Sequence, residues 1–309
     1  MNRQLLAAEF LATPWAMMPE RLNAFAAVMG RWSAGVGPTE ETLAKIEADR
    51  QLRAERKASL PTSGGSGIAV LPLYGVVTQR GNMVDDVSGP GSTSTQKFSS
   101  ALRQVLADES VGQILIDIDS PGGSVYGVAE LADEIYRARS QKPVIALANS
   151  LAASAAYWVG SAASEFYVTP GGEVGSIGVW QAHFDYSEAF ASEGVKPTLI
   201  SAGKYKVEGN PYAPLDEEAL GFMQSRVDEY YAAFTKAVAK GRGVSLSDVR
   251  DGMGQGRVLG ADTALEQRMV DGVMTFDEVL RKMSRAAKKT SSASRLAQAR
   301  NSLALASAI

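Results

Sequence analysis

From residue 68 onward, short runs of apolar residues alternate with segments in which apolar residues recur at the three- and four-residue spacing of a helix. Strands that alternate with helices in this way predict βαβ units around a mostly parallel sheet, and hence the α/β class. The predicted strands are Ile68–Val77, Gln113–Asp119, Val144–Ala148, Phe166–Thr169, Val174–Val179 and Pro197–Ile200, and the predicted helices are Ser94–Ala107, Val125–Arg139, Ala153–Ala163, Asp216–Lys240, Ser245–Arg250 and Gly260–Gln267.

The pattern differs at the two ends of the chain. Residues 1–33 carry apolar residues at roughly helical spacing, broken by Thr13-Pro14, and a charged helix-like segment follows. Glycine and serine then dominate Thr62–Gly67, a composition that suits a linker. We therefore expect a helical N-terminal arm over 1–58, a linker over 59–67, one α/β domain over 68–285 and a flexible tail over 286–309.

The composition excludes several kinds of chemistry. The chain has 309 residues, of which 45% are hydrophobic, so it can bury a sizeable core. It has no cysteine and a single histidine, His183, which excludes disulfides, thiolate catalysis and multi-histidine metal sites. We expect neither a metal nor a cofactor.

The charge is distributed unevenly. Although the net charge is only −3, seven basic residues and no acidic one follow Glu278. The basic tail predicts a modest, salt-sensitive affinity for polyanions but no specific nucleic acid. No apolar run approaches the roughly 20 residues that span a bilayer, so we expect no membrane anchor.

A turn with two glycines is the first candidate for chemistry. Asp119-Ser-Pro-Gly-Gly123 follows an apolar strand and precedes a predicted helix. Proline restricts its own φ and glycine permits backbone shapes that other residues avoid, so such a turn can expose peptide N–H groups. The amides of Gly122 and Gly123 are candidate donors to a developing oxyanion, although such a turn is often only a turn.

Ser154 is the candidate nucleophile. It stands in Leu151-Ala-Ala-Ser-Ala-Ala-Tyr157, where a strand is expected to give way to an alanine-rich helix. Small neighbours allow a substrate backbone to approach, and the amide of Ala155 is a candidate second oxyanion donor. The alternative is a serine that merely caps the helix.

A serine nucleophile needs a base, for which His183 and two lysines are candidates. A free lysine is uncharged only to about 0.04% at pH 7, and lowering its pKa to about 7 requires roughly 4.6 kcal/mol, which desolvation can supply. Lys206 lies among Tyr205, Val207 and Gly209 in a segment able to fold over a site. Lys204, two residues away, competes with it.

Four ordered motifs resemble the signal peptide peptidase A family of serine proteases, and in particular its bacteriophage branch of head maturation proteases. The motifs are Asp119-Ser-Pro-Gly-Gly123, the alanine-flanked Ser154, Gly175-Ser-Ile-Gly-Val179 and Gly203-Lys-Tyr-Lys-Val-Glu-Gly-Asn-Pro-Tyr212, and the similarity covers about Gly67 to Val273. The resemblance implies a ClpP/crotonase-like fold and a ring-shaped homo-oligomer. It also implies that phage capsid, scaffold and portal proteins are the substrates, cut inside an assembling prohead in the host cytoplasm.

The resemblance also implies roles for individual residues. Ser154 would be the nucleophile, Lys206 the general base, and Ser176 the hydroxyl that orients the lysine. Gly123 and Ala155 would donate to the oxyanion. Cellular members usually carry a membrane anchor and often have glycines at the positions of Ala155-Ala156, so this chain departs from them at both points.

Other interpretations remain open at this stage. His183 with an aspartate would make a Ser-His-Asp arrangement, and Asp117 with Asp119 would bind a divalent ion. A non-catalytic scaffolding protein, an acyl-CoA enzyme of the crotonase type and a soluble signal-peptide-peptidase-like protease of the host are the alternative functions.

Overall fold

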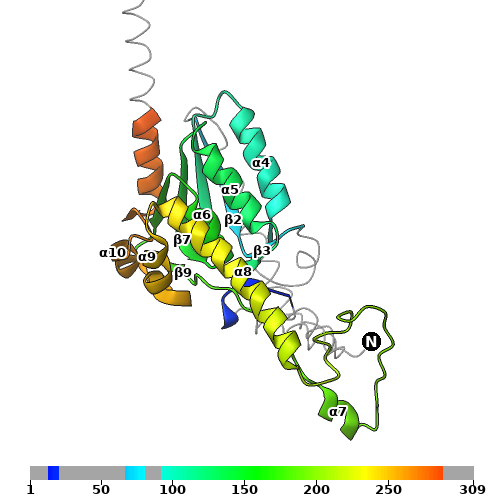
Figure 1. Ribbon diagram of the computed structural model, residues 1–309. Helices are drawn as coiled ribbons and strands as arrows, with labels where there is room; N and C mark the ends of the chain where they lie inside the picture. The colour runs from blue at the N-terminus through cyan, green and yellow to red at the C-terminus, as the bar shows by residue number, and fades with distance from the viewer. Residues whose placement is uncertain (1–12, 21–66, 81–91, 288–309) are drawn as a thin grey trace, which may run out of the picture.

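The computed structural model describes residues 13–20, 67–80 and 92–287. They form two β-sheets, with helices on both faces of the larger one (Figure 1). The strands are β1 (Trp15–Met17), β2 (Ile68–Tyr74), β3 (Val76–Thr78), β4 (Ser92–Ser94), β5 (Gln113–Ser120), β6 (Gly122–Ser124), β7 (Val144–Ala153), β8 (Glu165–Val168), β9 (Glu173–Gly175), β10 (Val258–Gly260) and β11 (Gly272–Val273). The helices are α4 (Thr95–Ala107), α5 (Val128–Ala138), α6 (Ala155–Ser161), α7 (Ser187–Ser192), α8 (Glu217–Arg242), α9 (Leu246–Asp251), the 3-10 turn η1 (Met253–Gly256), α10 (Ala261–Glu266) and a last helix over 276–287.

The larger sheet has the order β10-β9-β7-β5-β2, and β8 pairs with β7 on one side and β11 on the other. Its pairings are parallel except the one between β9 and β10. Along β5, Ile114, Ile116 and Ile118 pack toward one face and Leu115 toward the other. Successive side chains of a strand point to opposite faces of the sheet, so a strand whose side chains are all buried must be covered on both faces.

The first covering layer contains α4, α5, α6 and α8 (Figure 1). Every residue of α6 is buried, as expected for a helix enclosed on all sides. Trp158 of α6 stacks on Phe234 of α8 with ring centroids 4.7 Å apart. These contacts fix α6, and therefore the residue that precedes it, in the centre of the molecule.

The last helix, 276–287, covers the opposite face. Val279 and Met283 pack with Leu115, Ile145 and Tyr167 of the sheet. The predicted boundary between domain and tail, at 285/286, thus falls inside a helix. This helix was not predicted, because its apolar face is narrow and its charged residues resemble those of the tail.

The smaller sheet lies at the carboxyl ends of the central strands. Its order is β1-β6-β3-β4, and β3 and β6 directly follow β2 and β5. The sequence predicts one strand over Ile68–Val77, but Gly75 divides it: this glycine has φ 68°, and its N–H donates to the carbonyl oxygen of Asp119 over 2.9 Å. The chain therefore changes sheets at the point where the candidate residues gather.

The α/β class with βαβ units is confirmed, and the helices predicted within the domain are all present with shifted ends. Three predictions of local structure are wrong. No strand forms over Pro197–Ile200, and the predicted Val174–Val179 strand is limited to β9. Trp15–Met17, expected in a helical arm, is a strand because its backbone pairs with β6 and Trp180.

Most of the predicted arm and linker, and the tail beyond residue 287, lie outside the described residues. The helical arm, the linker and the flexible tail therefore stay predictions.

Candidate active site

Ser154 lies at the junction of β7 and α6, directly after Ala153 and before Ala155. Its φ of 54° and ψ of −117° form a conformation that residues with a side chain rarely adopt, at a cost on the order of 1–3 kcal/mol. The side chain makes no hydrogen bond to the helix N-terminus; its Oγ lies 3.4 Å from the carbonyl oxygen of Gly178. The hydroxyl therefore does not serve as a helix cap.

The two glycines of the turn are required by close packing around this serine. A Cβ atom at Gly122 would lie 2.3 Å from the carbonyl oxygen of Ala16 and 2.9 Å from Cβ of Ser154. At Gly123 it would lie 1.8 Å from the carbonyl oxygen of Val77. Only glycine fits at either position. Because these two residues have no side chain, the backbone of β6 lies close to Ser154.

The amides of this region do not all have the same freedom. The N–H of Gly122 donates to Oγ of Ser120 over 3.2 Å, so it is engaged inside the turn. Ala155 is the first residue of α6, and the first N–H groups of a helix have no acceptor within it. Gly123 lies opposite Ala16 of β1, so its N–H belongs to the pairing between β1 and β6. Gly123 and Ala155 remain the candidate oxyanion donors.

Ser176 follows β9 and lies on the same side of the junction as Ser154. The N–H of Ser154 donates to the carbonyl oxygen of Gly175 over 2.7 Å, which holds the end of β9 against the nucleophile. Ser176 has φ 53°, is 7% exposed, and donates its own N–H to the carbonyl oxygen of Arg257 over 2.7 Å. The structure thus places a second serine with a constrained backbone beside the first.

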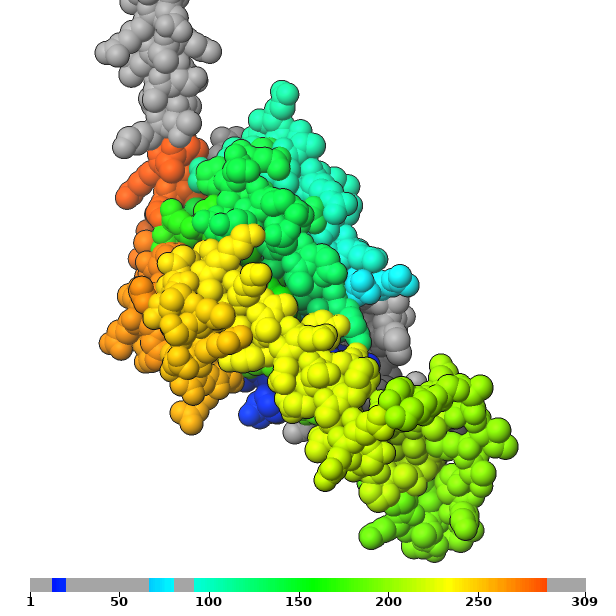
Figure 2. Space-filling model, in the orientation of Figure 1, coloured from blue at the N-terminus to red at the C-terminus, as the bar shows by residue number. Residues whose placement is uncertain are grey.

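Lys206 lies on the segment between β9 and α8, which projects from the sheets together with α7 (Figure 1). Much of this segment forms the yellow-green lobe in Figure 2. Lys206 is exposed there, and within the described ranges no hydrogen bond joins it to Ser154 or Ser176. The two serines and the two glycines thus lie close together, whereas Lys206 lies on an exposed segment and has no hydrogen bond to either serine among the described residues.

Lys204 has other partners. Its Nζ lies 2.9 Å from Oε1 of Glu218 and 2.8 Å from the hydroxyl of Tyr205. The hydrogen bond to Tyr205, followed by that to Glu218, raises the pKa of Lys204 above its ordinary value. A general base must instead lose its proton near neutral pH, so this geometry favours Lys206 over Lys204.

His183 serves the fold of the same projecting segment. Its Nε2 lies 3.0 Å from the carbonyl oxygen of Asn210, and among the described residues it has no hydrogen bond to Ser154. The arrangement offers no support for a Ser-His-Asp triad.

Asp117 and Asp119 of β5 were candidates for binding a divalent ion. Within the residues that the structure describes, no group of three or more His, Cys, Asp or Glu side chains is placed to hold an ion. Asp117 is 2% exposed and accepts a hydrogen bond from the hydroxyl of Tyr74. Its role is in the packing between β2 and β5.

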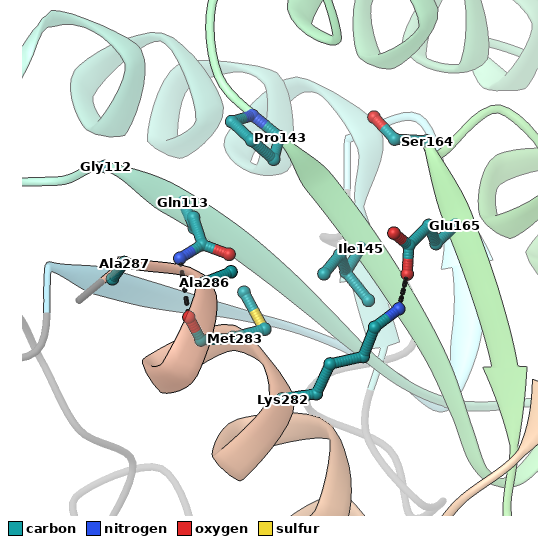
Figure 3. A pocket seen from close by; sticks show the side chains of 10 residues that line it. All are labelled: Gly112, Gln113, Pro143, Ile145, Ser164, Glu165, Lys282, Met283, Ala286 and Ala287. Atoms are coloured by element: carbon teal, nitrogen blue, oxygen red, sulfur yellow. Dashed lines mark hydrogen bonds and ion pairs between the residues drawn. The ribbon is translucent and has the colours of Figure 1, made fainter. Parts of the chain in front are cut away.

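A cavity of about 510 Å³ lies away from these residues, between the larger sheet and the last helix. Figure 3 shows the ion pair between Glu165 and Lys282 at one side of it, Met283 at the other side and Ile145 between them. None of the candidate catalytic residues lines this cavity. We therefore place the candidate active site at the junction of β7 and α6.

Sequence reasoning missed two neighbours of Ser154. The carbonyl oxygen of Gly178 faces its hydroxyl, although the sequence indicated no role for this glycine. Strand β1 lies against Gly122 and Gly123. Trp15–Met17 offered no signal, because a three-residue strand is too short to show a periodicity.

Comparison with known proteins identifies the family of the chain. The family model described as peptidase family S49 matches residues 136–290. Capsid assembly protease C of Escherichia phage lambda is 41% identical over 186 residues, which are 60% of this chain and 42% of the phage protein. Head-tail preconnector protein GP5 of Enterobacteria phage P21 is 37% identical over 221 residues, 72% of this chain and 43% of that protein. The chain thus spans less than half the length of either phage relative.

A shorter relative is matched over most of its length. This protein of Methanocaldococcus jannaschii, whose assigned name is that of a protease, is 30% identical over 224 residues, which are 72% of each chain. In the described part of this chain, no helix is long and apolar enough to cross a membrane. Since the family model covers half of the chain and this relative is matched over more than two thirds of its length, the chain belongs to peptidase family S49.

Proposed function

We propose that this chain is a serine endopeptidase that acts in the assembly of a phage head, with Ser154 as its nucleophile and Lys206 as its general base. The observation that carries the proposal is the strained backbone of Ser154 beside two glycines, in a chain of a peptidase family. Backbone strain of this kind persists only where the surrounding structure imposes it, and it concentrates at functional sites.

The chemistry follows the order of acyl transfer. Oγ of Ser154 attacks the carbonyl carbon of the scissile peptide while Nζ of Lys206 accepts the hydroxyl proton and passes it to the departing amine. The N–H groups of Gly123 and Ala155 hold the oxyanion, and the loss of one such donor typically costs about 10²–10³ in turnover. A water molecule, deprotonated by the same lysine, then releases the acyl group. Ser176 orients the lysine.

Lys206 must be brought to a Ser154 for this mechanism to operate. The projecting segment and the start of α8 expose a set of large apolar side chains, and exposed apolar surface of this kind marks an interaction site. These side chains are Val195, Leu199, Ile200, Tyr205, Leu220 and Phe222. We propose that they pack against another copy of the chain in a ring-shaped homo-oligomer.

The substrates that we propose are phage capsid, scaffold and portal proteins, cut within the prohead in the host cytoplasm. The names of the phage relatives support this choice: one is a capsid assembly protease and the other a head-tail preconnector protein.

Co-expression with capsid, scaffold and portal proteins of the same phage tests the proposed function. We expect the wild-type chain to produce fragments that mass spectrometry assigns to defined bonds. The His183→Ala variant should give the same fragments at a similar rate, because the hydrogen bond of the His183 ring among the described residues joins it to a backbone carbonyl and not to Ser154. If the wild-type chain cuts none of these proteins, the non-catalytic scaffolding function takes its place.

Light scattering after size exclusion tests the assembly. We expect Ile200→Asp combined with Phe222→Asp to lower the mass of the particle toward that of a monomer, because an aspartate at an apolar contact must lose its hydration. Ile200 is 95% exposed and Phe222 55%. Leu265→Asp is the matched control, since Leu265 is also exposed, at 41%, but lies on α10. An unchanged mass for the double variant would refute this role.

A further inference from the structure

Strand β1, from the N-terminal part of the chain, lies against the candidate nucleophile. A Cβ atom on Gly122 would lie 2.3 Å from the carbonyl oxygen of Ala16 and 2.9 Å from Cβ of Ser154, so both residues lie next to this glycine. Ala16 is completely buried. The backbone of β1 therefore fills the space next to Ser154 that a peptide substrate would need.

β1 is held by backbone hydrogen bonds along both of its edges. On one edge it pairs antiparallel with β6, with Ala16 opposite Gly123. On the other edge Trp15 and Trp180 exchange two hydrogen bonds of 2.8 and 3.0 Å. An added strand paired in this way is a common mode of peptide recognition, and the groove between β6 and Trp180 is therefore a site for an extended peptide.

The register of β1 places a carbonyl group at the proposed oxyanion donor. In an antiparallel ladder, hydrogen-bonded pairs alternate with pairs that are not hydrogen-bonded. The N–H of Met18 donates to the carbonyl oxygen of Pro121 over 3.1 Å, so the next hydrogen-bonded pair along the ladder is Ala16 with Gly123. The carbonyl group of Ala16 thus occupies the place of a substrate carbonyl.

Side chains anchor β1 in this groove. Trp15 is 5% and Met17 3% exposed, and they pack with Val76 and Trp180. The indole Nε1 of Trp180 donates to the carbonyl oxygen of Met17 over 3.0 Å. The segment in the groove therefore has large apolar residues, Trp15 and Met17, on each side of the small Ala16. A small residue fits the confined space at this position.

We propose that Trp15–Met17 is an internal occupant of the peptide-binding groove, which blocks the active site until the strand leaves. The proposal rests on the proposed function of Ser154. It means that the chain is inactive in the conformation of this structure, and that displacement of β1 by a substrate or by another protein opens the groove.

A reversible disulfide tests this proposal in the full-length chain, which has no cysteine of its own. Trp15 pairs with Ser124, and the alternation makes this a pair without hydrogen bonds, with Cα atoms about 4.5 Å apart, within the range of a disulfide. The variant Trp15→Cys/Ser124→Cys locks β1 in the groove when oxidised and frees it when reduced. The matched controls are the two single-cysteine variants.

Two readouts are measured on this variant. The first is cleavage of fluorescein-labelled β-casein, an unfolded substrate. The second, in the Ser154→Ala background, is fluorescence anisotropy of a labelled synthetic peptide of residues 13–20. We expect oxidation to lower the cleavage rate and the peptide affinity at least tenfold, reduction to restore both, and the single-cysteine variants to be indifferent to oxidation.

Equal cleavage or equal peptide binding in the locked and reduced states would overturn the proposal and make β1 a permanent wall of the site. Failure of the two cysteines to form a disulfide would also overturn it, since β1 would then not lie on β6. If no form cleaves casein but peptide binding follows the lock, the inference stands while the proposed function fails.

Discussion

We expect Ser154→Ala to abolish the proposed cleavage of phage head proteins, with a loss of turnover of about 10⁶-fold, the scale seen when a serine nucleophile is removed. The substitution deletes only Oγ, whose sole hydrogen-bond neighbour among the described residues is the carbonyl oxygen of Gly178. We expect the folded structure to be unchanged. Turnover measured with the purified protein, together with its circular dichroism spectrum, checks this.

Ser150→Ala is the matched control for this substitution. Ser150 lies on the same strand, β7, and also has a positive φ, of 115°, but it is exposed. We expect its replacement to leave turnover unchanged. Full activity of the Ser154→Ala variant would refute Ser154 as the nucleophile.

We expect Lys206→Ala to lower turnover by about 10²–10⁴-fold, the contribution typical of a positioned general base. The matched control is Lys204→Ala, two residues away on the same exposed segment. Because Lys204 is held by Glu218 and Tyr205, we expect its removal to change turnover less than threefold, within what an exposed ion pair contributes. The opposite ranking of the two variants would assign the base to Lys204.

Mixing the two inactive variants determines where the lysine acts. If Lys206 serves the Ser154 of a neighbouring copy, oligomers that contain both Ser154→Ala and Lys206→Ala chains regain activity, because one interface carries both intact side chains. If the segment closes over its own Ser154, no mixture is active. Subunit exchange is verified with differently tagged chains.

Local patterns along the chain were sufficient to predict most of the scaffold. β5 and β7 are apolar runs buried on both faces, and their hydrophobicity alone marks them as central strands. The start of α8 is also encoded locally: Asp216 caps it, and its side chain accepts the N–H of Ala219 over 2.7 Å. Such signals depend on only a few neighbouring residues, so they can be recognised without knowledge of the fold.

The candidate site was predictable in part. Gly122, Gly123 and Ser154 were recognisable as candidates because a tight turn requires particular residue types, here proline and glycine, and because the strand-to-helix junction is rich in alanine. The close approach that makes these residues useful was not, since Cβ of Ser154 and the carbonyl oxygen of Val77 come from strands distant in sequence. The proposed preference for Lys206 over Lys204 also rests on the position of Glu218, on another element.

By itself, the sequence determined the α/β class, the order of β2, β5, β7 and β8 and of the predicted helices, and the residue types available for acyl transfer, because periodicity, glycine and helix caps are local properties. Only the tertiary structure decided that β1 is a strand and lies beside Ser154, that Pro197–Ile200 forms none, and that Lys206 stands apart from the serines. These features depend on backbone hydrogen bonds and packing between segments far apart in the chain, and such contacts leave no pattern in either segment alone.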